Sequence, residues 1–151
     1  MTKTKESMIG KICLVTGANA GIGYAISLGL AKMGAIVIIV CRNKSKGEVA
    51  MTALKEKSES SSIFLFIADL SSQNSIRQFV TDFNAKFERL DILINNAGVI
   101  TQNRTLTVDG LETQFALNHL APFLLTELLL DSLKKSGAAR IINISSNAHQ
   151  T

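Results

Sequence analysis

Three glycines near the amino end of the chain follow a short apolar run, and their spacing suits a binding site for phosphate. Gly17 permits a tight turn at the end of a strand, and the missing Cβ atoms of Gly21 and Gly23 allow an anion and the next helix to approach the backbone. A helix that begins near residue 22 would direct unpaired N–H groups and a partial charge of roughly +0.5 at that anion. The segment therefore predicts a pyrophosphate-binding turn, with a glycine-rich turn that holds no ligand as the alternative. The residues assigned to it are Gly17, Asn19, Gly21, Ile22 and Gly23.

A second candidate binding residue, Arg42, follows the apolar run 36–41. Dinucleotide-binding proteins that select NAD often place a carboxylate here, against the ribose hydroxyls, and a carboxylate would repel a 2′-phosphate. The guanidinium of Arg42 is instead a planar fork of donors, and one charge-assisted contact of about 1.5–3 kcal/mol corresponds to a roughly ten- to hundredfold preference for NADP over NAD. We therefore expect NADP as the cofactor, with Lys44 or Lys46 as an additional candidate contact to the 2′-phosphate. The alternative is an arginine that faces solvent and contacts no ligand.

Two further segments at predicted strand ends carry residue types that suit a ligand site. Asp69 and Leu70 follow the run 63–67 and are placed to meet the edge and face of an adenine ring, although an aspartate that begins a helix explains Asp69 equally well. The segment Asn95–Gly98 follows the run 92–94. Its residues are poor strand formers, so a role other than sheet formation is indicated. Small residues allow a ligand to approach the backbone, and asparagine amides can tie a strand end to its neighbours.

The elements that position these residues alternate between strands and helices. Continuous apolar runs predict strands at 12–15, 36–40, 63–67, 92–94 and 140–144, and helical periodicity predicts helices at about 22–33, 45–58, 72–87 and 109–136. Right-handed crossovers then give an α/β fold, a doubly wound, Rossmann-like parallel sheet in the strand order 3-2-1-4-5. The ligand crevice should lie at the carboxyl ends of strands one and four.

Signals within the helical segments predict end points and buried positions. Ser72 is a suitable N-cap, and Gly137 is the expected stop of the last helix. The second helix is expected to bury little beyond Val49, Ala53 and Leu54.

Composition limits the classes of protein to consider. The chain has 151 residues, of which 46% are hydrophobic and 19% charged, as expected for a single globular domain spanning residues 1–151. The net charge is +4, but the lysines are scattered and are not interleaved with aromatic residues, so nucleic acid is not expected as a partner. Strongly apolar stretches such as Ile36 to Cys41 are far shorter than the roughly 20 residues of a membrane span.

The cysteines and the first residues bear on the compartment. Cys13 and Cys41 lie in apolar runs without the spacing of a metal site, so we expect buried, reduced thiols, and no metal site or disulfide. Residues 1–8 carry charges and hydroxyls but no apolar core, unlike a secretory signal. A cytoplasmic protein is therefore expected.

Taken together, the motifs resemble the short-chain dehydrogenase/reductase family. They are Thr-Gly-x3-Gly-Ile-Gly at 16–23, Asn-Asn-Ala-Gly at 95–98, Asn118, and Ile-Ser-Ser at 144–146. The stretches 107–112 and 115–126 are similar to the retinol-dehydrogenase-like branch, and the resemblance runs from about residue 10 to the last residue. It implies an NADP-dependent oxidoreductase that transfers a hydride between the nicotinamide cofactor and a small alcohol or carbonyl substrate.

The resemblance also implies a role for individual residues. It assigns the pyrophosphate to Gly17, Gly21, Ile22 and Gly23, the 2′-phosphate to Arg42, the adenine to Asp69 and Leu70, and the ribose region to Asn96 and Ala97 with the adjacent Gly98. Ser146 aligns with the family's catalytic serine, which hydrogen-bonds the reacting oxygen of the substrate. Ser145 is the competing candidate, and either serine could simply be a hydroxyl at a strand end.

Asn118 is a polar residue in an otherwise apolar helical stretch, where an unpaired amide would be unfavourable. Pro122 lies four residues later and has no N–H to donate to the Asn118 carbonyl, so that carbonyl is expected to be free. In the family the equivalent carbonyl holds a water of a proton relay, which makes Asn118 a candidate catalytic residue. The alternative is a proline kink in a packed helix without functional consequence.

The family's reaction also uses a tyrosine with a lysine four residues later, about a dozen residues beyond the serine, which contributes about 10²–10⁴ in rate. The chain's one tyrosine is Tyr24, and Leu28 stands four residues after it. We therefore expect the amino-terminal half of such an enzyme, truncated after strand five and nearly inactive alone. A catalytically inactive nucleotide-binding or interaction protein is the alternative.

An uncovered fifth strand and an uncovered apolar helix are expected to promote self-association or homo-oligomer formation. The helix is the one around Phe123, Leu125, Leu128 and Leu129.

Overall fold

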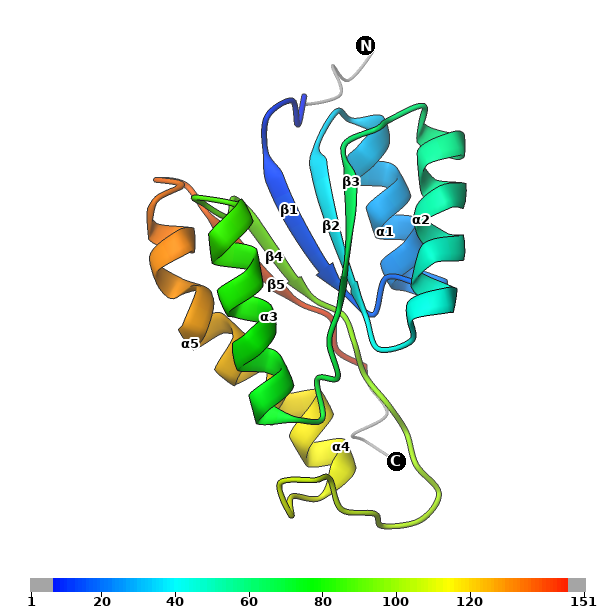
Figure 1. Cartoon of the computed structure of the whole chain (residues 1–151), viewed down its shortest axis with the longest axis vertical. Helices are drawn as coiled ribbons and strands as arrows, with labels where there is room; N and C mark the ends of the chain where they lie inside the picture. Colours follow the sequence, from blue (N-terminus) through cyan, green and yellow to red (C-terminus); the bar gives the residue numbers. More distant parts are fainter. Residues whose placement is uncertain (1–6, 147–151) are drawn as a thin grey trace.

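A computed structural model describes residues 7–146, which form one five-stranded sheet (Figure 1). Its strands are β1 (Ile12–Thr16), β2 (Ile36–Cys41), β3 (Ile63–Ile67), β4 (Ile92–Asn95) and β5 (Arg140–Asn143). All neighbouring strands are parallel, and their order is β3-β2-β1-β4-β5. The predicted fold class and strand order are therefore confirmed, and the carboxyl ends of all five strands lie at one edge of the sheet.

Helices cover both faces of the sheet, as a doubly wound fold requires. The helical elements are α1 (Gly21–Lys32), α2 (Lys44–Ser58), α3 (Gln73–Lys86), α4 (Thr113–Phe115), the π-helical segment η1 (Ala116–Leu120) and α5 (Ala121–Lys134). In Figure 1, α1 and α2 lie on one side of the sheet, and α3 and α5 lie on the other. Each pair packs on its own apolar cluster, and strand residues alternate between the two clusters.

The strands of the sheet interior are apolar except at their carboxyl ends, where β1 ends in Thr16 and β4 in Asn95, because both of their faces are covered. Leu14 of β1 packs in the cluster under α3 and α5, together with Phe79 and Phe83 of α3. Val15, the next residue, packs in the opposite cluster with Leu54 of α2. This two-sided burial explains why the sequence shows continuous apolar runs there without polar alternation.

Two local expectations about helices are wrong. The sequence predicts a buried Val49, but Val49 is 71% exposed; Leu54 is buried as predicted, and Gly47 and Ala50 are buried besides it. The last helical region begins at Thr113 rather than at Asp109. Residues 106–112 form a tight hairpin in which the Gly110 N–H donates to the Thr107 carbonyl, because Asp-Gly favours a turn more strongly than it favours a helix start.

Helix ends follow the expected chemistry elsewhere. The Ser72 side chain accepts a hydrogen bond from the Ser75 N–H and caps α3, as predicted. Gly137 takes the left-handed backbone conformation, with φ of +74°, three residues after the end of α5. Its missing Cβ allows the sharp stop that the sequence predicts there.

The expectation of an uncovered last strand and last helix is confirmed for the strand and only in part for the helix. All four residues of β5 are exposed, and Phe123 of α5 is 62% exposed, which confirms an uncovered edge. Leu125 and Leu129 contradict the expectation, since they are fully buried against the sheet and α3. Their spacing of four residues puts them on the inner face of α5, whereas Phe123 lies on the outer face.

Both cysteines are buried and free, as predicted. Burial, with a smaller contribution from the Asp91 carboxylate, raises the pKa of the Cys13 thiol to about 12, so this thiol is protonated at neutral pH. Within residues 7–146 no helix is both long and apolar enough to cross a bilayer. In the same part of the chain no group of three or more His, Cys, Asp and Glu side chains is placed to hold a metal.

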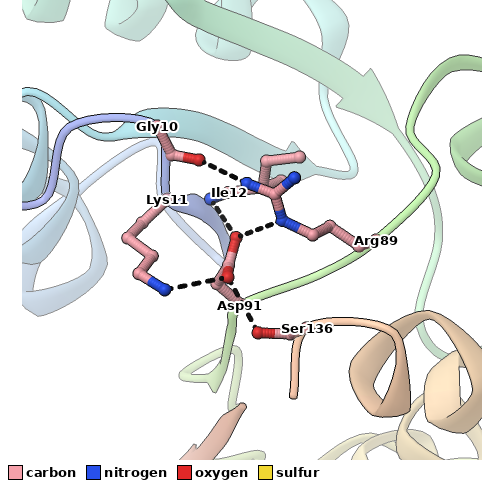
Figure 2. Close-up of polar contacts among 6 residues, drawn as sticks. All are labelled: Gly10, Lys11, Ile12, Arg89, Asp91 and Ser136. Carbon is pink, nitrogen blue, oxygen red and sulfur yellow. Dashed lines mark hydrogen bonds and ion pairs between the residues drawn. The ribbon is translucent and has the colours of Figure 1, made fainter. Parts of the chain in front are cut away.

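A buried carboxylate, Asp91, ties the amino end of the sheet together (Figure 2). It accepts hydrogen bonds from the Ile12 N–H at 2.8 Å and from the Ser136 hydroxyl at 2.8 Å. It also pairs with Lys11 Nζ at 3.3 Å and Arg89 Nε at 3.2 Å. One side chain therefore connects β1, β4 and the segment that follows α5. Burial raises the pKa of this carboxyl, but the four donors outweigh that effect and lower the pKa below its ordinary value.

Replacing Asp91 with asparagine should lower the free energy of unfolding by about 2–4 kcal/mol at pH 7, because a buried acceptor loses its charge while its partners stay in place. The folded-state pKa lies below the unfolded value of about 3.9, so this stabilisation is complete above about pH 5 and is lost as the pH falls below it. Urea unfolding at pH 7 and at pH 3.5 should therefore show a smaller loss of stability on acidification for the variant than for the wild type.

Asp82 offers a matched control for this experiment. Its exposed carboxylate accepts one hydrogen bond, from the Gln78 side chain within α3. Asp82→Asn should keep the stability and the pH dependence of the wild type. An Asp91→Asn variant with the same pH dependence as the wild type would contradict the role given to Asp91.

Candidate cofactor-binding site

The glycine turn between β1 and α1 packs directly against the segment that follows β4. Gly17 has φ of +65°, and a Cβ at this position would lie 2.9 Å from the Ala97 Cα. Its N–H donates to the Val40 carbonyl at 2.9 Å, which fixes the turn to β2. Gly17 is therefore required both by its backbone conformation and by the close approach of a second backbone.

The two following glycines have different tasks. A Cβ at Gly23 would lie 2.6 Å from the Gly17 carbonyl oxygen, so this glycine allows α1 to pack on the turn. Gly21 has φ of +56°, but a Cβ there would meet no atom of the described chain within 4 Å. Gly21 thus leaves the space next to the amino end of α1 open, while Gly23 allows α1 to pack closely on the turn.

The amino end of α1 has no side-chain cap, and this distinguishes it from α2 and α3. Asn43 caps α2 and Ser72 caps α3, whereas Ala20 precedes α1 and provides no acceptor. Unpaired N–H groups and the positive end of a helix next to open space suit an anion. The residues present therefore fit a pyrophosphate, as the sequence predicts.

Thr16 holds this turn to the end of β4, a role that sequence reasoning missed. Its hydroxyl oxygen accepts hydrogen bonds from the N–H groups of Asn96 and Ala97, both at 3.0 Å. Thr16 is buried, so its hydroxyl must find its hydrogen-bond partners within the protein. A threonine placed directly before the first glycine was the available signal, since its hydroxyl must find a partner once the strand is buried.

The two asparagines after β4 tie strand ends together, as expected from their amides. Asn95 Nδ2 donates to Asn143 Oδ1 at 2.8 Å and connects β4 with β5. Asn96 Nδ2 donates to the carbonyls of Thr16 at 2.9 Å and Gly17 at 3.3 Å. The Asn96 amide nitrogen is thus engaged by the turn, which gives this residue a structural role besides the predicted one.

Two adjoining pockets at this edge contain most of the predicted site residues. The first, called here the Arg42 pocket, has a volume of about 260 Å³ and contains Gly17, Asn19, Arg42, Asp69, Leu70, Asn96, Ala97 and Gly98. The second, called here the Ser146 pocket, has a volume of about 790 Å³ and contains Ile22, Asn96, Ala97, Gly98, Asn118, Ser145 and Ser146. The shared residues place the two pockets side by side along the segment after β4. Of the predicted cofactor-binding residues, Gly21 and Gly23 line neither pocket.

Five residues of the Arg42 pocket were not predicted from the sequence. They are Val40, Cys41, Ala68, Val99 and Leu117. Four of them complete the wall with apolar surface, and they come from four separate segments of the chain. No spacing in the sequence marks such a set, because only the packing of the strands brings it together.

Asp69 fits both of the explanations given for it. Its Oδ1 accepts hydrogen bonds from the Ser71 N–H at 2.9 Å and the Ser71 hydroxyl at 2.6 Å, as in an aspartate that shapes a helix entry. Asp69 and Leu70 also line the Arg42 pocket, where the prediction puts the adenine. The bonds to Ser71 therefore hold the Asp69 carboxylate in the wall of the pocket without a ligand.

Asn118 lies in the π-helical segment η1 and not in a kinked α-helix. The Ala121 N–H donates to the Ala116 carbonyl, five residues earlier, and Pro122 then enters at the start of α5, where its missing N–H is tolerated. The Asn118 side chain makes two 2.8 Å bonds to Val99, one with its N–H and one with its carbonyl. The side chain thus fixes the segment shared by the two pockets, and the relay role of the Asn118 backbone carbonyl stays a prediction.

The two serines after β5 both face the Ser146 pocket, so the choice between them stays open. Ser145 also lines a third pocket, beside β5 and the outer face of α5. The hydrogen bond from the Ile144 N–H to the Asn95 carbonyl, at 2.9 Å, holds this segment beside β4. The pairing of β4 with β5, which the side-chain bond between Asn95 and Asn143 reinforces, therefore also positions the two serines.

Comparison with known proteins identifies the family. A family model described as short chain dehydrogenase matches residues 11–151, which is nearly the whole chain. The chain belongs to the short-chain dehydrogenase family. The predicted resemblance is thereby confirmed, including the retinol-dehydrogenase-like branch. Retinol dehydrogenase 12 of Bos taurus is 46% identical over 147 residues, which are 97% of this chain and 46% of that protein. The chain spans about half the length of the curated relatives it matches.

Solved structures of the family superimpose closely on the described fold. A metagenomic short-chain oxidoreductase in complex with NADP has a TM-score of 0.83 at 31% identity, over 95% of this chain and 66% of that chain. The Pseudomonas aeruginosa RhlG/NADP complex has a TM-score of 0.80 at 35% identity, over 93% and 56% of the two chains. Both comparisons support the Rossmann-like arrangement.

Thr16→Val should lower the free energy of unfolding by about 2–4 kcal/mol, because two part-buried N–H groups lose their acceptor while the side-chain volume is kept. Thr16→Ser keeps the hydroxyl and should lose only about 1 kcal/mol. Urea unfolding of the two variants measures the difference. Equal losses would show that the methyl group, not the hydroxyl, matters at this position.

Proposed function

We propose that the chain binds NADP(H) and forms the cofactor-binding part of an oxidoreductase. The observation that carries the proposal is the position of Arg42, which lines one pocket together with Asn19 of the glycine turn and Asp69. Arg42 directly follows β2 and lines this pocket, so we expect its side chain to be within reach of a ribose 2′-phosphate if the pyrophosphate occupies the glycine turn. An arginine at this point favours a phosphate over a free hydroxyl.

The charge at the start of α2 supports the same assignment. Lys44 and Lys46 lie in the first turn of this helix, which contains no acidic residue. Cations at the positive end of a helix are unfavourable by about 0.3–1 kcal/mol, so this arrangement is better explained by an anion nearby. Lys44 has a weak partner in Glu48, at 3.9 Å, and Lys46 borders a groove that also contains Asn19. Both similar structures named above are NADP complexes.

The substrate side of the proposal concerns the Ser146 pocket. Bound NADP(H) would supply or accept the hydride, and an alcohol or carbonyl group would lie in this pocket. Ser146, or Ser145, would donate a hydrogen bond to the reacting oxygen, while the Asn118 side chain keeps Val99 in place between the two pockets. Many of the curated relatives are retinol dehydrogenases, which supports an alcohol or carbonyl substrate.

A second candidate function is nucleotide binding without catalysis. The chain's one tyrosine, Tyr24, lies on α1 and lines neither the Arg42 pocket nor the Ser146 pocket. It therefore cannot serve as the acid that the family's reaction needs at the substrate. Binding of the cofactor without oxidation of NADPH by carbonyl compounds and without reduction of NADP+ by alcohols would favour this second function.

Arg42→Ala should weaken the affinity for NADPH about ten- to hundredfold and leave the weaker affinity for NADH nearly unchanged, because NADH has no 2′-phosphate. Titration calorimetry with both cofactors measures the two effects. Arg77→Ala, which removes an exposed arginine of α3, is the control and should change neither affinity. An equal loss for both cofactors, or no loss for either, would remove the assignment of Arg42.

Gly21→Ala should abolish detectable NADPH binding, because its Cβ would project into the space reserved for the pyrophosphate. The positive φ predicts a loss of only about 1–2 kcal/mol in the free energy of unfolding. Gly137→Ala is the matched control, since Gly137 also has a positive φ and open space around it but lies far from the site, after α5. The two variants should unfold at similar urea concentrations, and NADPH binding by Gly21→Ala would contradict the assigned cradle.

A further inference from the structure

We propose that Asp109 is a positioning residue for the wall of the Arg42 pocket, although it lines neither that pocket nor the Ser146 pocket. The proposal rests on the NADP(H)-binding function given above. It concerns the affinity for the adenosine end of the cofactor, where Asp69 and Leu70 form the wall.

Asp109 is held in a tight hairpin, which gives its carboxylate a defined direction. The Thr107 N–H donates to the Leu111 carbonyl at 2.8 Å, and the Gly110 N–H donates to the Thr107 carbonyl at 3.0 Å. Leu106 and Glu112 pair as an isolated antiparallel bridge at its base. The hairpin is therefore a structured element, and Asp109 lies at its tip.

The carboxylate reaches the first residue of α3. The Gln73 N–H donates to Asp109 Oδ2 at 2.8 Å, across 36 residues of sequence. Asp109 Oδ2 thereby satisfies one of the backbone donors that have no partner within the helix at the amino end of α3. Figure 1 shows this end of α3 beside the loop that precedes α4.

The amino end of α3 in turn fixes the wall of the pocket. The Asp69 N–H donates to Ser75 Oγ at 2.9 Å, and the Ser72 N–H donates to the Asp69 carbonyl at 3.1 Å. The segment with Asp69 and Leu70 is thus fastened to the first turn of α3. A shift of that turn must move both wall residues.

Leu70 also stands between the Arg42 pocket and a mainly apolar cavity of about 280 Å³ behind it. Asp109 and Leu111 of the hairpin line that cavity. The space behind Leu70 allows the wall to move if the link to the hairpin is lost. Asp109 therefore limits a displacement that packing alone does not prevent.

The test is the affinity of the chain for 2′,5′-ADP, which represents the adenosine end of NADP, measured by calorimetry. Asp109→Ala should weaken the affinity for 2′,5′-ADP about fivefold. This is the change expected when a helix cap that orders the pocket wall is lost. Asp109→Asn keeps a side-chain oxygen as acceptor and should recover the affinity to within about twofold. Rescue by asparagine would not occur if only the charge of the surface mattered.

Glu112→Ala provides the matched control. Glu112 lies on the same hairpin and caps α4 through the N–H groups of Gln114 and Phe115, so its loss should leave 2′,5′-ADP affinity unchanged. Equal affinity of Asp109→Ala and wild type, or an equal loss in Glu112→Ala, would overturn the positioning role while leaving the proposed function intact. Failure of the wild type to bind 2′,5′-ADP would overturn both.

Discussion

The Thr16 hydroxyl and the two N–H groups it receives are the contact on which the geometry of the site depends. Through it the end of β1 and the segment after β4 lie close enough for a Cβ at Gly17 to touch Ala97. The Arg42 pocket and the Ser146 pocket share the segment 96–99, which begins at this contact. A ligand that spans both pockets needs this shared wall, because one end of it must lie on each side of the segment 96–99.

The opposite edge of the sheet is held by a different kind of interaction. At the amino end, one charged group, Asp91, accepts hydrogen bonds or pairs with donors from three segments of the chain. At the carboxyl end, neutral hydroxyl and amide groups make the links, and α1 is left without a cap. The difference is physical: a charge satisfied by the protein stabilises a closed edge, whereas unpaired N–H groups at an open edge are available to an anion.

The walls of the site also depend on segments outside the sheet. The Asn118 side chain fixes Val99 from the helical segment η1, and Asp109 holds the amino end of α3. Both residues lie in the stretch between β4 and α5, which contributes little to the core. This stretch is consequently the part of the fold that sets the shape of the pockets without being needed to build the sheet.

The order of elements, the parallel sheet and the glycine turn could be predicted from the sequence, because apolar runs and glycine spacing reflect local chemistry that does not depend on distant residues. The sequence also predicted most of the residues of the two pockets, since a parallel sheet brings the ends of neighbouring strands to one edge. It failed where a local preference competed with another: Asp109 and Gly110 form a hairpin instead of a helix start, and Val49 faces solvent. Three features became visible only in the folded chain: Thr16 links two strand ends, the Asn118 side chain binds Val99, and Gly21 faces open space while Gly23 does not. Those features depend on distances between residues far apart in the chain, and such distances cannot be read from spacing along the sequence.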